Sequence, residues 1–358
     1  MIGAGLSPAA ASIRIPAAGL NRQESVIKEI GLPLAAAFVA AFAVARALLA
    51  PAAARFALDR PNPRSLHAAP VPRSGGVAVM AGIAIGAALL PGQQGLVPIA
   101  AGALLMFVVG VADDVRGLAP AWRLIAQLVA AGISLWPLQA ALGSLALCAI
   151  LALAVMWVTN LYNFMDGSDG LAAGMAVIGF GAYAIAAGLA GDAQLAALAS
   201  AIAAAALAFL RWNFHPARIF LGDCGSLPLG FLAAGVGVLG AGRGHWTLVF
   251  PLLAFAPFIA DASLTLARRL LKREHVWRAH RDHYYQRLVR MGCGHRGVAL
   301  GGYALMLGSA ATAIAGRALT VETQIAALAG WSLAFLAMAQ AVDLRWRRFA
   351  DKARHEAA

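Results

Sequence analysis

Charged residues are scarce in this chain. Asp, Glu, Lys and Arg together make up 12% of its 358 residues, about half the share found in an average soluble domain. Hydrophobic residues make up 61%, and the mean hydropathy is +0.76. This balance excludes an ordinary soluble enzyme and predicts a polytopic membrane protein built as one helical bundle, without a second folded domain.

Cysteine is also rare. The three cysteines, Cys148, Cys224 and Cys293, are an odd number and show no metal-binding spacing, so we expect no disulfide framework. The net charge of +12 raises the question of a nucleic-acid partner. The basic residues, however, lie in the loops between apolar runs, which is typical of membrane proteins. We therefore expect no nucleic acid.

Eleven apolar runs approach the length that crosses a bilayer. They cover residues 32–50, 75–91, 96–112, 121–138, 142–159, 171–190, 193–210, 226–241, 246–271, 298–316 and 323–341. Several are short or close together, so we expect an all-α transmembrane bundle of ten to eleven helices. The run 246–271 contains Pro251 and Pro257, which predicts a kinked or broken helix.

The basic residues fall unevenly on the two sides of this bundle. When the loops are numbered alternately, one side carries 22 of the 28 Lys and Arg residues. Its segments are the loops 51–74, 112–123, 160–170, 211–225 and 268–297 and the tail 342–358. Because cationic loops stay in the cytoplasm, we expect the N-terminus outside and the C-terminus inside. The N-terminal lead, with three basic residues, departs mildly from this rule.

This pattern divides the chain into three parts. We expect an N-terminal lead at residues 1–30, a transmembrane domain at residues 31–341 and a basic cytoplasmic tail at residues 342–358.

Acidic residues number only sixteen, and five of them lie at ends of apolar runs on the basic side. They are Asp113, Asp114, Asp166, Asp169 and Asp223. Carboxylates at such a depth are costly unless they are paired, wetted or bound to a cation. A polar turn capped by Asp and Asn is the simpler interpretation of residues 160–170, but a turn needs fewer polar residues than this stretch contains.

Clustered carboxylates and amides without His or Cys pairs favour a hard cation such as Mg²⁺. Basic side chains nearby suit a substrate that carries a pyrophosphate. For most of the Arg and Lys residues, retention of the loops in the cytoplasm is a sufficient explanation. His280 and His283 are less easily explained in this way, since their spacing places both on one side of a helical turn.

Five sequence blocks, taken together, resemble the polyprenyl-phosphate N-acetylhexosamine-1-phosphate transferases. The blocks are residues 59–67 with 70–76, 110–118, 160–174, 213–226 and 279–288. They cover roughly residues 33–340, and their order on one membrane face makes the resemblance specific. The motifs are closest to the O-antigen-initiating branch, which uses UDP-GlcNAc or 6-deoxy relatives such as UDP-FucNAc. Asp282 stands where many relatives have a histidine, which argues against a pentapeptide substrate.

The resemblance implies a reaction. A HexNAc-1-phosphate is transferred from a UDP-sugar to undecaprenyl phosphate on the cytoplasmic face of the bacterial inner membrane, and UMP is released. The expected cofactor is Mg²⁺, with Mn²⁺ as an alternative, and a homodimer is also compatible with the family.

The resemblance also implies roles for individual residues. Asp223 is expected to bind the metal, with Asn163 and Asp166 beside it, and Asp166 also belongs to the catalytic group. Asp113 and Asp114 are expected to handle the lipid phosphate. The expected substrate-binding residues are Asn160, Asp169, Asn213, Phe220, Arg64 and His67. Phe220 is expected to stack on uracil, and Asp169 and Asn213 are expected to contact the uridine. His280 and His283 are expected beside the pyrophosphate.

Three other classes of protein compete with this interpretation. A transporter of an anionic solute can also contain carboxylates and broken helices, but its site should lie near the bilayer midplane, often in an internal repeat, and the sequence has no evident repeat. A CDP-alcohol phosphotransferase has fewer helices and a different Asp spacing. A purely structural membrane protein does not need five convergent acids. Within the transferase interpretation, single displacement by the lipid phosphate and a covalent aspartyl intermediate remain alternatives.

Overall fold

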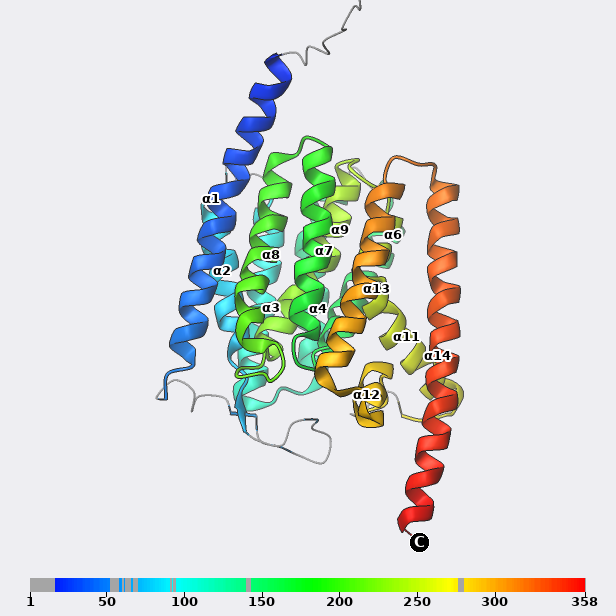
Figure 1. The fold of residues 1–358 in the computed structure, drawn as a ribbon. Coiled ribbons are helices and arrows are strands. Elements are labelled where there is room, and N and C mark those ends of the chain that lie inside the picture. Colours follow the sequence, from blue (N-terminus) through cyan, green and yellow to red (C-terminus); the bar gives the residue numbers. More distant parts are fainter. Residues whose placement is uncertain are drawn as a thin grey trace, which may run out of the picture.

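The computed structural model describes residues 17–51, 58–59, 61, 66, 70–90, 92, 95–139, 143–275 and 280–357. This part of the chain is a bundle of helices standing side by side (Figure 1). The helices are α1 (Ala17–Leu48), α2 (Gly75–Ala88), α3 (Val97–Arg116), α4 (Pro120–Leu135), α6 (Leu145–Phe164), α7 (Leu171–Leu189), α8 (Ala193–Asn213), α9 (Asp223–Gly242), α10 (Val249–Ala254), α11 (Ala256–Leu271), α12 (Tyr284–Leu288), α13 (Gly294–Gly316) and α14 (Val321–Ala357). A 3-10 turn (Trp136–Leu138), a π-helical turn (Val289–Cys293) and two short antiparallel strands, β1 (Leu58–Asp59) and β2 (Val71–Pro72), complete it.

The expected all-α membrane bundle is confirmed. Each of the eleven apolar runs falls on a helix or a pair of consecutive helices. Within the described residues, nine helices are long and apolar enough to cross a membrane. The helix α2, at 14 residues, is shorter than these.

The helix break predicted in the run 246–271 is also confirmed. Phe255 ends α10, and its φ of −112° and ψ of 16° depart from helical values. Pro257 occupies the start of α11, where its missing N–H removes no helical hydrogen bond. The proline therefore begins a new helix and cannot continue the old one.

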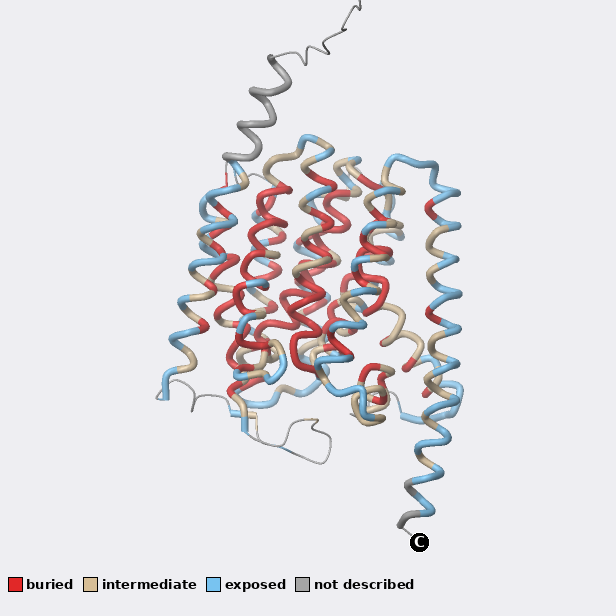
Figure 2. The backbone as a smooth tube through the Cα atoms, in the orientation of Figure 1, coloured by how far each residue is buried: buried red, intermediate tan, exposed pale blue. Residues whose placement is uncertain are grey.

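Small residues allow the helices to approach closely. Ala37 and Ala41 of α1 are fully buried, and a Cβ added to Gly82 of α2 would lie 2.6 Å from the Ala37 carbonyl oxygen. Lipid tails are as apolar as Leu, so close packing takes over the role of the hydrophobic effect in holding membrane helices together. Buried residues gather in the central helices α7, α8 and α9, whereas α14 is mostly exposed (Figure 2).

Backbone hydrogen bonds connect the segment after β2 with the segment before α9. The amide of Phe220 donates to Pro72 O at 2.7 Å, and the amides of Gly75 and Gly76 donate to Phe220 O and Leu221 O. A Cβ at Gly76 would lie 2.2 Å from the Gly225 nitrogen. Glycine at position 76 therefore permits two of the five sequence blocks to lie against each other.

Both expected domain boundaries fall inside helices. The helix α1 runs without a break through residues 30 and 31, and α14 runs through residues 341 and 342. In Figure 1, α14 extends well beyond the end of the bundle. Residues 1–16 of the expected lead lie outside the described residues, and the three-part division of the chain stays a prediction.

Candidate active site

Four carboxylates meet at one end of the bundle, and we call them the carboxylate cluster: Asp113, Asp114, Asp166 and Asp223. Asp113 and Asp114 lie in the last turn of α3, and Asp223 is the first residue of α9. The two helix ends approach closely because residue 110 is glycine. A Cβ there would lie 2.3 Å from the carbonyl oxygen of Asp223.

Asp114 holds the start of α9 in place. Its carboxylate accepts hydrogen bonds from the amides of Asp223 at 3.1 Å and Cys224 at 2.9 Å, two donors that have no partner inside the helix. A negative charge at a helix N-terminus is also stabilised by the helix dipole. Arg73 lies beside the same carboxylate, with Nε 3.5 Å from Oδ1. Asp114 therefore orients Asp223.

Arg123, from the first turn of α4, lies between Asp113 and Asp223. Its Nη1 donates to Asp113 Oδ2 at 2.7 Å and reaches Asp223 Oδ2 at 3.4 Å. The amide of Leu118 donates to the other oxygen of Asp113 at 2.6 Å. Sequence reasoning did not single out Arg123. The available signal was an arginine one loop after two adjacent acids, in the first turn of the next helix.

Asn163, at the end of α6, completes this side of the cluster. Its Nδ2 donates to Asp223 Oδ1 and to Ser226 Oγ, both at 2.8 Å. Asp166 follows one turn later. Burial raises its pKa well above the ordinary value, and the charges of Asp223 and Asp114 raise it further. The carboxylates therefore repel one another at this point, and a cation would relieve the repulsion.

The cluster offers oxygen ligands only, which fits Mg²⁺. Within the described residues, no group of three His, Cys, Asp or Glu side chains is arranged as a ready-made metal centre. Mg²⁺ does not need one, because it commonly takes one or two carboxylates and fills its other positions with water and substrate phosphate. Asp223 and Asp166, with the amide oxygen of Asn163 turned inward, would suffice.

Asn160 and Asn213 are both occupied by protein partners. Asn160 Nδ2 donates to Gln127 Oε1 at 2.6 Å across α4 and α6. Asn213 donates to Ile219 O at 3.0 Å and accepts from the amide of Gly170 at 3.1 Å, which ties together two sequence blocks. Their expected substrate contacts stay predictions.

Asp169 lies between two histidines. Its Oδ2 is 2.6 Å from Nδ1 of His215 and accepts from the amide of Ala217 at 3.1 Å. Its Oδ1 is 3.8 Å from Nδ1 of His295, and the two imidazole rings stack at 5.5 Å. Neither histidine was singled out from the sequence, since each lies far from Asp169 along the chain. The uridine contact expected of Asp169 stays a prediction.

His280 and His283 lie together near the end of α6. Their rings stack at 5.0 Å, and the His283 ring is 6.0 Å from that of Phe164, next to Asn163. Burial lowers the pKa of His280 to about 4, and the charges of His283 and Arg269 contribute in the same direction. His280 Nδ1 accepts from the amide of Asp282 at 3.3 Å.

The remaining expected residues are placed in part. Phe220 is half-buried, on the segment that leads into Asp223. Arg64 and His67 lie outside the described residues. Leu66, between them in sequence, is described, and its carbonyl oxygen is 3.4 Å from Nε2 of His295. Leu66 therefore lies at the same end of the bundle.

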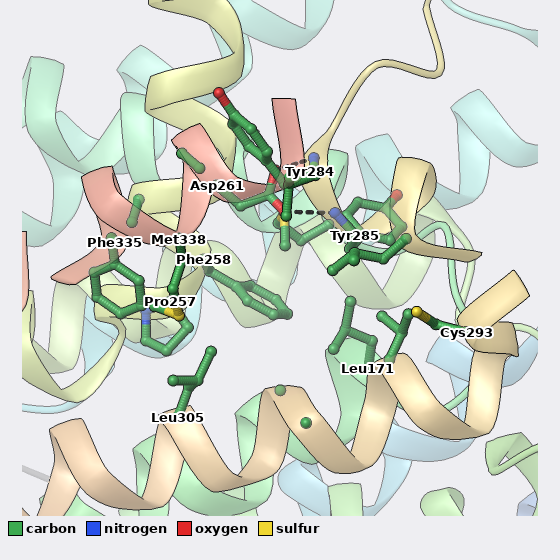
Figure 3. Close-up of a pocket in the computed structure, with 18 of the residues that line it drawn as sticks. Leu171, Pro257, Phe258, Asp261, Tyr284, Tyr285, Cys293, Leu305, Phe335 and Met338 are labelled. Carbon is green, nitrogen blue, oxygen red and sulfur yellow. Dashed lines mark hydrogen bonds between the residues drawn. The ribbon is translucent and has the colours of Figure 1, made fainter. Parts of the chain in front are cut away.

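An apolar pocket of about 420 Å³ opens beside the cluster, between α11, α13 and α14 (Figure 3). Met165 and Leu171, on either side of Asp166 in sequence, line it together with Phe258, Leu305 and Phe335. Asp261 and Tyr284 are among its few polar lining residues. The break between α10 and α11 lies next to this pocket, since Pro257 also lines it.

The sequence profile of glycosyl transferase family 4 matches residues 96–241. A probable undecaprenyl-phosphate N-acetylglucosaminyl 1-phosphate transferase of Bacillus subtilis is 32% identical, over 67% of this chain and 72% of the relative. A decaprenyl-phosphate N-acetylglucosaminephosphotransferase of Mycobacterium tuberculosis is 31% identical, over 68% and 72%. An undecaprenyl-phosphate alpha-N-acetylglucosaminyl 1-phosphate transferase of Yersinia pestis is 29% identical, over 81% and 85%.

Proposed function

Because the chain belongs to glycosyl transferase family 4, among the polyprenyl-phosphate N-acetylhexosamine-1-phosphate transferases, we propose that it transfers HexNAc-1-phosphate from a UDP-sugar to undecaprenyl phosphate. UMP is the second product. The donor is UDP-GlcNAc or a 6-deoxy relative such as UDP-FucNAc, and the lipid-linked sugar starts a surface polysaccharide such as O-antigen. The observation that carries this proposal is the carboxylate cluster lying beside an apolar pocket at one end of a membrane bundle.

The two substrates suit the two halves of this arrangement. An isoprenoid chain is apolar and fits the pocket lined by Phe258, Leu305 and Phe335. Its phosphate then lies toward Met165 and Leu171, which flank Asp166. The UDP-sugar is water-soluble and enters from the end of the bundle. We place this end on the cytoplasmic face of the bacterial inner membrane, since the loops there carry most of the basic residues.

Transfer requires two anions to meet. A bound Mg²⁺ or Mn²⁺, held by Asp223 with Asn163 and Asp166, supplies charge neutralisation at the diphosphate. Asp114 keeps Asp223 oriented at the start of α9. Arg123 offers a second positive charge, because its guanidinium can bind a phosphate oxygen while it also binds Asp113.

His280 contributes as a neutral group. With a pKa of about 4 it carries no charge near pH 7. Its Nδ1 accepts from the Asp282 amide, so the ring proton resides on Nε2. That N–H can donate to a phosphate oxygen of the leaving UMP. The acceptor phosphate is already anionic and needs little deprotonation, which favours single displacement over a covalent aspartyl intermediate.

An activity assay with the purified protein in detergent tests this proposal. The protein is mixed with undecaprenyl phosphate, Mg²⁺ and each of a panel of UDP-N-acetylhexosamines, and UMP is quantified. We expect UMP only when lipid, metal and one class of sugar nucleotide are all present. Folded protein that releases no UMP with any member of the panel would refute the proposal. A transporter is less compatible with the structure, because the cluster lies at helix ends and not at mid-depth.

A further inference from the structure

One acidic side chain outside the carboxylate cluster holds the segment that carries the two histidines. Asp261, in the second turn of α11, accepts from two consecutive backbone amides, Tyr284 N at 3.0 Å and Tyr285 N at 2.9 Å (Figure 3). These amides begin α12, so neither has a partner inside that helix. Each carboxylate oxygen takes one of them. An asparagine here would put an NH2 group, which is a donor, where one of these two oxygens accepts.

The same carboxylate also reaches His283. Nδ1 of this ring lies 3.3 Å from Oδ1 of Asp261, and the ring is only 4% exposed. His283 stacks on Tyr285 at 5.9 Å as well as on His280. Asp261 is thus the charged group that faces His283 from α11, while His280 stacks on the face of the ring.

A chain of contacts continues from this segment to the carboxylate cluster. Tyr285 Oη donates to the carbonyl oxygen of Phe164 at 3.0 Å. Phe164 follows Asn163, which donates to Asp223. A shift of α12 would therefore move the His283 ring relative to the residues that surround the diphosphate.

We propose that Asp261 is a positioning residue for the transfer, which fixes the His283 ring and the start of α12 against the carboxylate cluster. This inference rests on the proposed function. The helix break before Pro257 starts α11 anew, and the second turn of this helix brings Asp261 against the start of α12. Asp261 also lines the apolar pocket, so the acceptor lipid and the histidine segment share one residue.

The alternative explanation is purely structural: Asp261 caps the short helix α12 and stabilises the fold. Asp343 of α14 provides a matched control, since it holds the same segment without touching His283. Its Oδ1 accepts from Arg287 Nη1 at 2.7 Å and from Arg268 Nη1 at 2.5 Å, and Arg287 is almost completely buried. Asp343→Asn therefore loosens the segment but leaves the Asp261 contacts in place.

The first measurement needs no substrate. The full-length protein in detergent is treated with diethylpyrocarbonate, and modification of each histidine is followed by peptide mass spectrometry. His215, with 41% of its side chain exposed, serves as the internal reference. We expect His283 to react at least about 10-fold faster in Asp261→Asn than in the wild type. In Asp343→Asn, its rate should stay within about 3-fold of the wild-type rate. These factors correspond to roughly 1.4 and 0.7 kcal/mol of local opening.

The second measurement separates kcat from KM. Misplacing a catalytic group by about 1 Å can cost about 100-fold in rate, so we expect Asp261→Asn to lower kcat by about 10- to 100-fold and to leave KM for the UDP-sugar within about 2-fold. Asp343→Asn should keep near-normal kcat. Asp261→Glu retains charge and both oxygens but is longer. This variant should fold, expose His283 to the reagent and lose part of its kcat. If Asp261→Asn does not fold, Asp261→Glu still tests the inference.

Protection of His283 in both Asp261 variants, or equal effects of Asp261→Asn and Asp343→Asn on kcat, would overturn the inference. The two failures can be told apart. Absence of UMP release by the wild type contradicts the proposed function, whereas the labelling of His283 is read without turnover and reports on positioning alone.

Discussion

Arg123 donates a 2.7 Å hydrogen bond to Asp113, from the first turn of α4 to the last turn of α3. The same nitrogen lies 3.4 Å from Asp223. A positive side chain therefore already occupies part of the space between two of the residues that would surround a metal and a diphosphate. Its charge has two opposing effects, since it competes with the metal and it attracts the phosphate.

The first prediction separates these two effects. In Arg123→Gln the carboxylates lose a competing cation, so the Mg²⁺ concentration for half-maximal activity should fall. The side chain of Arg123 is 29% exposed, and a partly exposed pair contributes about 1 kcal/mol, or about 5-fold. At saturating Mg²⁺, kcat should be about 10- to 100-fold lower because a charge at the transferring phosphate is lost. Initial rates over a Mg²⁺ series decide between these roles, and a higher Mg²⁺ requirement would contradict competition.

The second prediction concerns Asp223. Asp223→Asn keeps the size of the side chain and removes its charge, so we expect at least about a 100-fold loss of turnover, or about 2.7 kcal/mol of barrier. Folded protein in the membrane should remain close to the wild-type amount. Near-normal turnover at limiting Mg²⁺ would show that Asp223 is not a ligand.

Asp192 supplies a control for that experiment. It lies at the opposite end of the bundle, where it pairs with Arg243 and His245, each at 2.7 Å. Asp192→Asn should lower the melting temperature and leave kcat unchanged, because its contacts join loops far from the carboxylate cluster. A large loss of kcat in this variant would mean that the assay reports stability.

The third prediction concerns the proton on Asp166. Its raised pKa means that Asp166 in the metal-free protein keeps its proton to a higher pH than an ordinary aspartate does. A metal ligand must be deprotonated, so Mg²⁺ binding should release this proton. Calorimetric titration of Mg²⁺ in two buffers of different ionisation enthalpy measures the release. Asp166→Asn should remove it, and an unchanged release in that variant would assign the proton to another group.

The fourth prediction is a pH dependence set by His280. Its pKa of about 4 lies below the ordinary 6.5, so the unfolded chain binds more protons than the folded one between these values. Stability should therefore fall as the pH drops from about 6.5 toward about 4, and His280→Gln should reduce this fall. Because the His280 ring of the folded protein is neutral between pH 6 and 8, the variant should lower kcat/KM there without changing the shape of the pH profile of kcat/KM. Loss of an inflection near pH 6.5 in the variant would contradict a neutral His280.

The helices of this fold could be predicted from the sequence because hydrophobic length alone specifies them in a membrane. The break at Phe255 followed from Pro251 and Pro257 for a similar reason, since proline acts through local geometry. The gathering of the acids at one end could be predicted because successive loops alternate between the two sides of a membrane bundle. None of these inferences requires knowing how one helix is rotated against another.

The partners of the acids could not be predicted, because they depend on that rotation. Arg123 reaches Asp113 because the first turn of α4 lies against the last turn of α3. His215 and His295 meet at Asp169 from segments that are 80 positions apart. Asp261 lies inside an apolar run, and only the folded chain brings the start of α12 onto its carboxylate. Long-range side-chain pairs of this kind carry no local sequence pattern.

The fifth prediction tests nucleotide recognition apart from chemistry. Backbone hydrogen bonds hold Phe220 on both sides, through Pro72 and Gly75, so its backbone is fixed three residues before Asp223. Stacking of an aromatic ring on a base contributes about 1–3 kcal/mol. Phe220→Ala should therefore raise KM for the UDP-sugar by about 5- to 150-fold and leave the dependence on lipid phosphate almost unchanged. Phe220→Tyr, which retains a stacking face, should stay near the wild type.

Asp169 completes this test, because it is expected to accept the uracil N3–H while the structure pairs it with His215 at 2.6 Å. Asp169→Asn should weaken the preference for UDP- over CDP-sugars, since the N3 of cytosine is an acceptor and a site built for a donor rejects it. His215→Gln removes the imidazole that contacts Asp169 and keeps the carboxylate, so it should leave that preference intact. Competition between UDP- and CDP-sugars in one reaction measures both variants. If His215→Gln weakens the preference as much as Asp169→Asn does, Asp169 acts by holding His215 and the loop around Ala217, and the base is read by another residue.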